Sequence, residues 1–378
     1  MLRWFTAGES HGPAVLAIME GMPAGLAVDP AVIQDDLGRR QRGHGRGGRM
    51  NIERDRVQVV GGIRHGRTTG APIALVVENR DYANWSKVMN PWPASGTPPV
   101  TRPRPGHADL AGAQKYRHGD LRDVIERASA RETAARCAAG SIARQFLTCL
   151  DMAVWSYVTA IGTVEAAIVS RSREAVESSP VRCPDPRASE SMCRAIDAAA
   201  AAGDTLGGCF EVMATGVPPG LGSHVQWDRR LDARLAGSLM GINGIKGVEV
   251  GLGFATARLP GSEVHDGIYW DGRYHRRTNR AGGIEGGMSN GEDLVLRAAM
   301  KPIPTLKKPL PSVDMKDRSA VAAHAERSDV CAVPAAAVVA EAVVALELAR
   351  AVLEKFGGDS VEDTLAAYRR YLEEVARL

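Results

Sequence analysis

Two histidines in glycine-bordered turns are the residues best suited to move protons. His11 lies in TAGESHG (residues 6–12) and His107 in RPGHADL (residues 104–110). An unperturbed imidazole has a pKa of about 6.5, so a histidine can gain or lose a proton near neutral pH. Asp329 is the carboxylate in the most suggestive setting, because it follows Arg-Ser directly before a long apolar stretch. A structural role is the alternative for each, since most histidines are structural and an aspartate before a helix can complement the helix dipole.

Basic residues recur beside glycines or at predicted helix starts. The clearest examples are Arg40, Arg46, Arg49, Arg127, Arg131 and Lys301. Arginine keeps its charge at neutral pH and forms two parallel hydrogen bonds with a carboxylate or phosphate, but it does not give up its proton. The pattern therefore predicts a substrate that carries phosphate and carboxylate groups, while the histidines and the aspartate handle protons.

The most glycine-dense stretch, residues 279–305, leads into a predicted strand that ends in Lys-Pro-Ile-Pro-Thr. Five glycines lie within ten residues of it, which is typical of a backbone that adopts positive φ and offers N–H groups to a flat or anionic ligand. The strand presents Arg297 and Lys301, and the prolines around Ile303 predict an ordered, extended exit from the sheet. A mobile surface loop is the alternative interpretation.

Short strands and long helices must position these residues. The apolar periodicity and turn signals predict strands over residues 3–7, 14–19, 57–62, 71–78, 152–168 and 208–217. The same signals predict helices over residues 30–38, 126–150, 189–202, 228–240, 333–356 and 361–378. Strands and long helices do not alternate in βαβ order, so we expect an α+β fold in which one domain spans residues 1–378.

A helix start is predicted inside the second of these helices. Ser129-Ala130-Arg131-Glu132 has the capping-box form, in which the serine bonds the N3 amide and the glutamate returns to the cap amide. A helix that begins there presents N–H groups and the positive end of its dipole, which is a favourable seat for an anion.

Composition excludes several classes of function. Lysine and arginine exceed aspartate and glutamate by only 3, so no global field favours nucleic acid or membrane partners. The six cysteines show no CxxC pair, which predicts reduced thiols and no metal site. The first residues lack the apolar core of a signal peptide, and no apolar run is long enough to span a membrane. A cytoplasmic protein is therefore expected.

The loop RRQRGHGRGGRM (residues 39–50) allows two other interpretations. Residues 43–48 fit G-x-G-x-x-G formally, but no strand is predicted before them and no helix after them, so a Rossmann site is rejected. An RGG-like RNA-binding segment normally repeats within low-complexity sequence. This loop occurs once and is followed by ordinary strand patterns, which favours an enzyme over an RNA-binding protein.

The chain resembles the chorismate synthase family in long segments that follow the family order. They are TAGESHG (6–12), GHGRGGRM (43–50), RPGHADLAGAQKY (104–116), RASARETAARCAAG (127–140), NGIKGVEVGLGF (243–254), the glycine-dense stretch 279–305, and RSDVCAVP (327–334). The departures are small, with His44 where the family often has tyrosine, Ala128 where some members have serine, and Cys137 where valine is common. Residues 90–103 and 170–205 match less closely and receive no function.

The resemblance implies a fold and a reaction. The family has a β-α-β sandwich with long helices between antiparallel sheets, assembled as a homotetramer. Its members end the shikimate pathway to aromatic amino acids: 5-enolpyruvylshikimate-3-phosphate loses phosphate and a ring proton in an anti 1,4-elimination that gives chorismate. The reaction requires reduced FMN although there is no net redox change.

The resemblance also implies roles for residues. His11 would protonate the reduced flavin, His107 would assist the departing phosphate, and Asp329 would help to relay the ring proton through flavin N5. Ser10 and Ser129 would support these groups. The implied FMN contacts are Arg127, Ala128, Ser129, Asn243, Gly244, Gly286, Lys301, Pro302, Ile303, Pro304, Thr305 and Arg327.

A source of electrons for the flavin is the remaining implied partner. Arg40 and Arg46 match positions that the family assigns to NADPH, whereas Arg49 and Arg131 are expected to clamp the substrate. Some family members reduce flavin themselves, so a flavin reductase activity is an alternative function for the chain. The other source would be an external flavin reductase.

Overall fold

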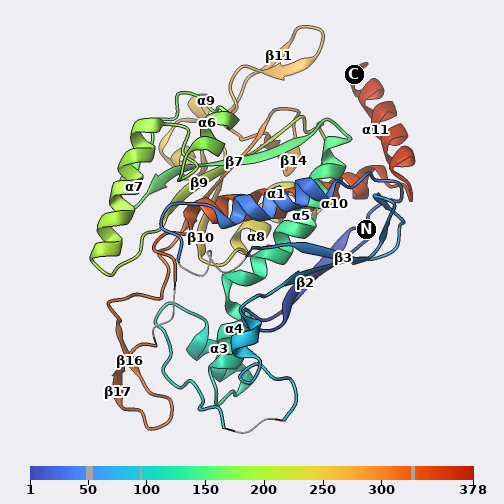
Figure 1. The fold of residues 1–378 in the computed structure, drawn as a ribbon. Helices are drawn as coiled ribbons and strands as arrows, with labels where there is room; N and C mark the ends of the chain where they lie inside the picture. The colour runs from blue at the N-terminus through green and yellow to red at the C-terminus, as the bar shows by residue number, and fades with distance from the viewer. Residues whose placement is uncertain (48–53, 94–95, 325–327) are drawn as a thin grey trace.

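Two antiparallel sheets enclose a layer of helices (Figure 1). The computed structural model describes residues 1–47, 54–93, 96–324 and 328–378 of the chain. The first sheet has the order β1-β2-β6-β3, with bounds Arg3–Gly8, Ala14–Glu20, Ile73–Glu78 and Val57–Gly61. The second has the order β10-β15-β9-β7-β8, with bounds Ile245–Val250, Leu294–Met300, Gly208–Thr215, Ala153–Ile161 and Val164–Glu165. The expected α+β fold, with helices between antiparallel sheets, is confirmed.

The helical layer is built from α1 (Pro30–Gln41), α5 (Thr133–Thr148), α8 (Leu231–Met240) and α10 (Val333–Phe356). Helix α5 packs on β2 and β6 of the first sheet, and α10 packs on β7 and β9 of the second. The two helices also pack along each other, while α1 contacts both and α8 joins α10 to β10. Because α10 is covered on all sides, nearly all of its residues are buried, as a helix with apolar residues all round requires.

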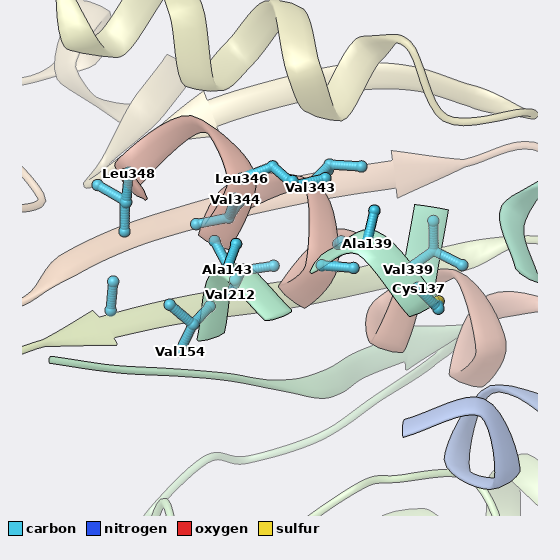
Figure 2. Packing of buried hydrophobic residues seen from close by; sticks show 14 of the residues in the cluster. Cys137, Ala139, Ala143, Val154, Val212, Val339, Val343, Val344, Leu346 and Leu348 are labelled. Carbon is cyan, nitrogen blue, oxygen red and sulfur yellow. The ribbon is translucent and has the colours of Figure 1, made fainter. Parts of the chain in front are cut away.

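Small residues allow α5 and α10 to approach closely (Figure 2). Gly140 of α5 faces Ala342 of α10, and a Cβ atom added to Gly140 would lie 2.5 Å from the Cα atom of Ala342. Real Cβ atoms do not approach other atoms so closely, so any side chain at residue 140 would push the helices apart. The alanine-rich sequences of both helices therefore set the thickness of the central layer.

Alternation in the first sheet matches its single covered face. Val15, Ala17 and Met19 of β2 are buried, and each is paired with a buried residue of β6. Because neighbouring side chains in a strand point to opposite faces, one face of this sheet carries the apolar residues against α5.

The predicted helix over residues 126–150 is interrupted at Ser129. Helix α4 (Arg122–Ala128) ends there, Ser129 has extended backbone with ψ of 142°, and a 3₁₀ turn (Ala130–Glu132) leads into α5. Ser129 is the N-cap as expected, but its hydroxyl accepts from the amide of Arg131 at N2 and not from the predicted N3 amide of Glu132. The glutamate half of the capping box is wrong, because the Glu132 carboxylate binds Thr6 and Arg136 instead.

The other predicted elements differ mainly at their ends. The predicted strand over residues 152–168 divides into β7 and β8, and α8 starts late because a 3₁₀ turn (Trp227–Arg229) precedes it. The remaining helices are α2 (Tyr82–Trp85), α3 (Asp109–Tyr116), α6 (Arg173–Ser178), α7 (Pro186–Ala201), α9 (Gly261–Val264) and α11 (Val361–Val375). Short hairpins are β4 (Ile63–Arg64) with β5 (Arg67–Thr68), β11 (Ile268–Trp270) with β12 (Tyr274–Arg276), β13 (Ile284–Glu285) with β14 (Met288–Ser289), and β16 (Pro311–Val313) with β17 (Ala320–Ala322).

The described part of the chain contains no helix with the length and apolar character needed to cross a bilayer. The six cysteines are unpaired thiols. Within the described residues, no group of three or more histidine, cysteine and carboxylate side chains is placed to hold a metal ion.

Candidate active site

A cavity of about 840 Å³ opens where the sheets, the helical layer and the α3–α4 region meet. Its walls come from segments far apart in sequence, including the turn after β1, the end of α1, the α4–α5 junction, the end of β15 and the start of α10. Four arginines, one lysine and two histidines lie among the lining residues. The volume falls within the range of roughly 300–1,000 Å³ typical of small-molecule sites.

His11 is held at this cavity by a buried carboxylate. Its Nδ1 atom lies 2.9 Å from Oε2 and 3.0 Å from Oε1 of Glu126, and its backbone N–H donates to Oε2 at 2.8 Å. The imidazole also stacks on Trp85, with ring centroids 4.0 Å apart. Burial would raise the pKa of Glu126, but the hydrogen bonds from His11 and Arg122 outweigh burial and lower it. The carboxylate is therefore ionised and accepts from Nδ1–H.

His107 has a similar partner on another wall of the cavity. Its Nδ1 atom makes a short contact with Asp109, which is the first residue of α3 and is fully buried. Arg104 donates to the same carboxylate through Nε at 2.8 Å and through Nη2 at 3.1 Å. Burial opposes ionisation of Asp109, but the bonds from His107 and Arg104 dominate and lower its pKa well below the usual range. Both histidines thus present Nδ1–H to a buried anion.

Two arginines with predicted site roles, Arg131 as a substrate clamp and Arg40 as an NADPH contact, share one buried aspartate. Arg40 donates to Oδ2 of Asp55 at 2.5 Å, and Arg131 makes a short contact with Oδ1 of the same carboxylate. The Arg131 guanidinium also donates to Asn79 at 2.7 Å and to the Glu78 carbonyl at 3.1 Å. Burial would raise the pKa of Asp55, but the two arginines lower it. These contacts fix the two guanidinium groups before any ligand arrives, which is the arrangement that electrostatic preorganisation requires.

Asp329 ties the glycine–arginine loop to the segment before α10. Its Oδ2 accepts from Nη1 of Arg46 at 2.6 Å, and its Oδ1 accepts from the Gly47 amide at 2.6 Å. The Val330 amide donates to the Gly45 carbonyl at 2.8 Å. Asp329 is not the N-cap of α10, which begins at Val333 with Ala332 as its cap.

One wall of the cavity is largely apolar. The segment Lys301 to Thr305 leaves the sheet after Met300, as predicted, and lines the cavity throughout. Asn243 lies beside it and donates from Nδ2 to the Ala128 carbonyl at 3.0 Å. Its Oδ1 atom is buried and accepts no hydrogen bond from the described residues. Ser10 and Ser129 complete this region, with their hydroxyl oxygens 3.1 Å apart. The wall residues are Ala128, Ile242, Asn243, Gly244, Met300, Lys301, Pro302, Ile303, Pro304, Thr305, Ala335, Ala336 and Val339.

Not every predicted site residue reaches this cavity. Arg127 is absent from its lining, and the Arg127 guanidinium donates instead to the Thr6 and Gly8 carbonyls of β1. Gly286 lies in the turn between β13 and β14, which Figure 1 shows on the other side of α10 from α3 and α4. Arg49 and Arg327 lie outside the described residues.

The five glycines of the dense stretch have positive φ, as predicted, but none of them lines the cavity. Gly282, Gly283 and Gly287 serve close packing: a Cβ atom on Gly282, for example, would lie 2.6 Å from the Cα atom of Gly251. Arg297, on the strand that follows, donates to Glu211 and Glu249 and also stays outside the lining. The part of this stretch that lines the cavity is therefore its proline-containing end.

Four residues that build the site were not predicted from the sequence: Asp55, Trp85, Asp109 and Glu126. Asp109 is two residues from His107, so a polar partner within the same turn was a usable signal. Glu126 is separated from His11 by 115 positions, and no local pattern announces such a contact. Asp55 and Trp85 depend in the same way on tertiary packing.

Comparisons with known proteins agree on one family. The family model described as chorismate synthase matches residues 2–353. The chorismate synthase of Symbiobacterium thermophilum is 60% identical over 394 residues, covering 100% of both chains. That of Desulforudis audaxviator is 58% identical over 383 residues, covering 99% of this chain and 98% of its own. A crystal structure of chorismate synthase has a TM-score of 0.81 and 40% identity, covering 100% of this chain and 99% of its own.

Proposed function

The chain belongs to the chorismate synthase family, and from this premise we propose that it converts 5-enolpyruvylshikimate-3-phosphate into chorismate and phosphate. It is an enzyme of the shikimate pathway, a lyase that eliminates phosphate from carbon. We propose further that the elimination is anti and 1,4, and that reduced FMN is required without net redox change.

One observation carries this proposal. Two histidines, each bound through Nδ1 to a buried carboxylate, line the same cavity as a set of fixed cations. Loss of phosphate needs stabilisation of a highly charged leaving group, and removal of a ring proton needs positioned acid–base groups. A cavity with both kinds of group at once is suited to this elimination more than to simple ligand storage.

Arg131 and Lys301 are the described cations that we assign to the anionic groups of the substrate and cofactor. Arginine can bind carboxylate or phosphate with two parallel hydrogen bonds. The Lys301 ammonium group makes a short contact with the Gly106 carbonyl, beside the turn that carries His107. We expect Arg49 to join them as a substrate clamp.

The cavity fits a flavin in two respects. Its wall of prolines, Ile303, Met300 and α10 alanines matches the apolar face of a flat ring. The buried Oδ1 atom of Asn243, which accepts no hydrogen bond from the described residues, would satisfy a ring N–H donor. When bound, reduced FMN supplies electron density to the allylic system of the substrate. We assign Ala128, Ser129, Asn243, Gly244 and Lys301 to Thr305 as its contacts.

Proton movements are assigned to three side chains. Because Nδ1 of each histidine is bound to a carboxylate, Nε2 is the atom that gains or loses a proton. We propose that His107 gives its Nε2 proton to the departing phosphate and that His11 holds a proton at Nε2 beside the cofactor. Asp329 is assigned to help relay the ring proton, which it would hold at a carboxylate oxygen. Ser10 and Ser129 support the hydrogen bonding between these groups.

The proposal is tested by mixing the protein anaerobically with dithionite-reduced FMN and 5-enolpyruvylshikimate-3-phosphate. Chorismate should form, and its absence under these conditions would overturn the assignment. His11→Ala, with its fold intact, should lose turnover by roughly 10²-fold or more, the scale expected for a positioned acid–base group. A near-wild-type rate would return His11 to a structural role.

The electron source, the assembly and the location also belong to the proposal. Arg40 and Arg46 line the cavity and are the residues we assign to NADPH. Anaerobic mixing with oxidised FMN and NADPH distinguishes the two sources: NADPH oxidation by the pure protein means self-reduction, and no oxidation means an external reductase. We propose a homotetramer that acts in the cytoplasm.

A further inference from the structure

Glu126 is the one buried carboxylate among the described residues that binds both the side chain and the backbone of His11. Its Oε2 accepts from the His11 amide at 2.8 Å, and both of its oxygens lie within 3.0 Å of Nδ1. The Glu126 carbonyl also accepts from the Ser10 amide at 3.0 Å. The Glu126 side chain is only 1% exposed. Glu126 of α4 therefore holds the turn between β1 and β2 by three contacts. Its carboxylate binds the His11 amide and the His11 ring, and its backbone carbonyl binds the Ser10 amide.

The contact between Glu126 and His11 belongs to a closed series of four side chains, which Arg122 and Trp85 complete. Arg122, one turn before Glu126 on α4, donates to Oε1 at 3.1 Å. The Arg122 guanidinium lies 5.1 Å from the Trp85 ring, and Trp85 stacks on His11. The stack limits rotation of the imidazole, and the carboxylate fixes which edge faces α4. Arg122 in turn offsets the cost of burying the Glu126 charge.

We propose that Glu126 is a positioning residue for His11. Its carboxylate keeps the proton of the neutral imidazole on Nδ1, and its negative charge favours the doubly protonated imidazolium. Neutral imidazole carries one proton, so a proton held at Nδ1 makes Nε2 the atom that exchanges. An ionised carboxylate next to the ring stabilises the imidazolium. The effect of Glu126 on turnover rests on the proposed function, whereas its effect on the orientation and protonation of His11 does not.

A glutamine at position 126 tests this hold with little change in shape. The Glu126 oxygens receive protons from the His11 amide, His11 Nδ1 and Arg122. An amide replaces one acceptor with a donor, so at least one of these N–H groups would face another N–H group. It also removes the negative charge. Glu126→Asp keeps the charge but shortens the reach.

Other charged groups near His11 must be accounted for in any pH measurement. They come from the turn itself, from the residue before α2, from α4 and from the remaining cavity walls: Glu9, Asp81, Arg122, His107 and Arg131. Each of them is present in the wild type and in the Glu126 variants. A difference between these proteins therefore reports on Glu126.

The experiment measures carbethoxylation of His11 by diethylpyrocarbonate, which reacts with unprotonated imidazole, across pH 5 to 8 by peptide mass spectrometry. In Glu126→Gln the midpoint should fall by about one pH unit or more, because an adjacent carboxylate shifts an ionisable group by roughly this amount. Glu126→Asp should stay within about half a unit of the wild type. Glu211→Gln, a buried glutamate outside the cavity, should leave the midpoint unchanged.

An unchanged midpoint in Glu126→Gln would overturn the proposal, because the carboxylate would then have no hold on the imidazole. A fall of the same size in Glu211→Gln would also overturn it. If Glu126→Gln does not fold, Glu126→Asp is the deciding variant. A modification midpoint close to that of the wild type supports the proposal, whereas a fall of about one pH unit or more, although the charge is kept, contradicts it. Since no substrate is present, failure of the proposed reaction leaves this result intact.

Turnover supplies a second measurement. In the anaerobic assay, Glu126→Gln should lower kcat by at least about 10-fold with a smaller change in KM, as expected when a carboxylate that orients a histidine is neutralised. A change in KM alone would contradict a positioning role for Glu126 in the reaction. The Glu211→Gln protein should keep both constants.

Discussion

Nη1 of Arg46 donates a hydrogen bond to Oδ2 of Asp329 across 2.6 Å, and both side chains line the cavity. The other oxygen of Asp329 accepts from the Gly47 amide. The aspartate therefore joins two segments that are separated by 283 positions, and it does so at the place where we expect proton transfer.

Asp329→Asn should separate these two roles. Asparagine can still accept from Gly47, but its amide nitrogen would face the Arg46 donor and it cannot take up a proton as a carboxylate does. Turnover in the anaerobic assay should fall by roughly 10²-fold or more, with a small change in thermal midpoint. Asp197→Asn, at an exposed aspartate, is the matched control. Near-wild-type turnover in Asp329→Asn would reduce Asp329 to a structural tie.

Lys301→Met should weaken binding of the anionic cofactor or substrate. Burial and the nearby Lys246 both lower the pKa of Lys301, so its ammonium group gains from any anion that approaches. A hydrogen bond to a charged group contributes about 1.5–3 kcal/mol, which corresponds to a loss of roughly 10- to 100-fold in affinity. A fluorescence titration with FMN measures the loss of affinity for the cofactor, and KM reports the change for the substrate. Lys307→Met, at an exposed lysine outside the lining, should bind normally.

The exit segment Lys301 to Thr305 shows what sequence patterns can predict. Prolines forbid strand pairing at fixed positions, so its departure from the sheet followed from local chemistry. The helix start at Ser129 could likewise be predicted from its capping sequence, whereas the separate helix α4 before it could not, because residues 126–148 keep a helical apolar pattern on both sides of Ser129. Only packing against Ser10, Thr6 and Arg136 fixes the break and the direction of Glu132.

Site residues divide in the same way. His11, His107 and Asp329 sit in distinctive local sequence and could be proposed without a structure. Their carboxylate partners could not, apart from Asp109, because buried ion pairs such as Glu126 with His11 join elements that are distant in the chain. The glycines of residues 282–291 show the reverse error, since close backbone packing and ligand binding favour the same residue type.

Gly140→Ala should destabilise the protein. The added Cβ atom would meet Ala342 at the crossing of α5 and α10, and overpacking of this kind costs about 1–3 kcal/mol. Gly237→Ala on α8 is the matched control, because a Cβ atom there would meet nothing within 4 Å and alanine favours a helix by roughly 0.5–1 kcal/mol. Urea denaturation midpoints should shift in opposite directions. Equal shifts of the two urea midpoints would mean that α5 and α10 can move apart to admit the added methyl group without loss of stability.

A buried ion cluster should make stability depend on acid pH. Glu341 of α10 accepts from Arg39 at 2.8 and 2.9 Å and from Arg182 at 3.0 Å. Burial alone would raise the pKa of Glu341, but the attraction of the buried arginines outweighs burial and lowers it to about 2. A lowered carboxylate pKa contributes stability that is complete above the unfolded-state value, near 4.3. That contribution disappears as pH falls from about 4.3 to about 2.

Glu341→Gln should therefore be less stable at pH 7 and should lose less stability on acidification. Leaving buried arginines without their anion costs about 3–5 kcal/mol, so its urea midpoint at pH 7 should lie well below that of the wild type. The two midpoints should converge as pH approaches 2, because protonation then removes the same charge from the wild type. Glu190→Gln, at an exposed glutamate, should follow the wild type throughout. A difference that stays constant from pH 7 to pH 2 would mean that Glu341 is not ionised in the folded protein.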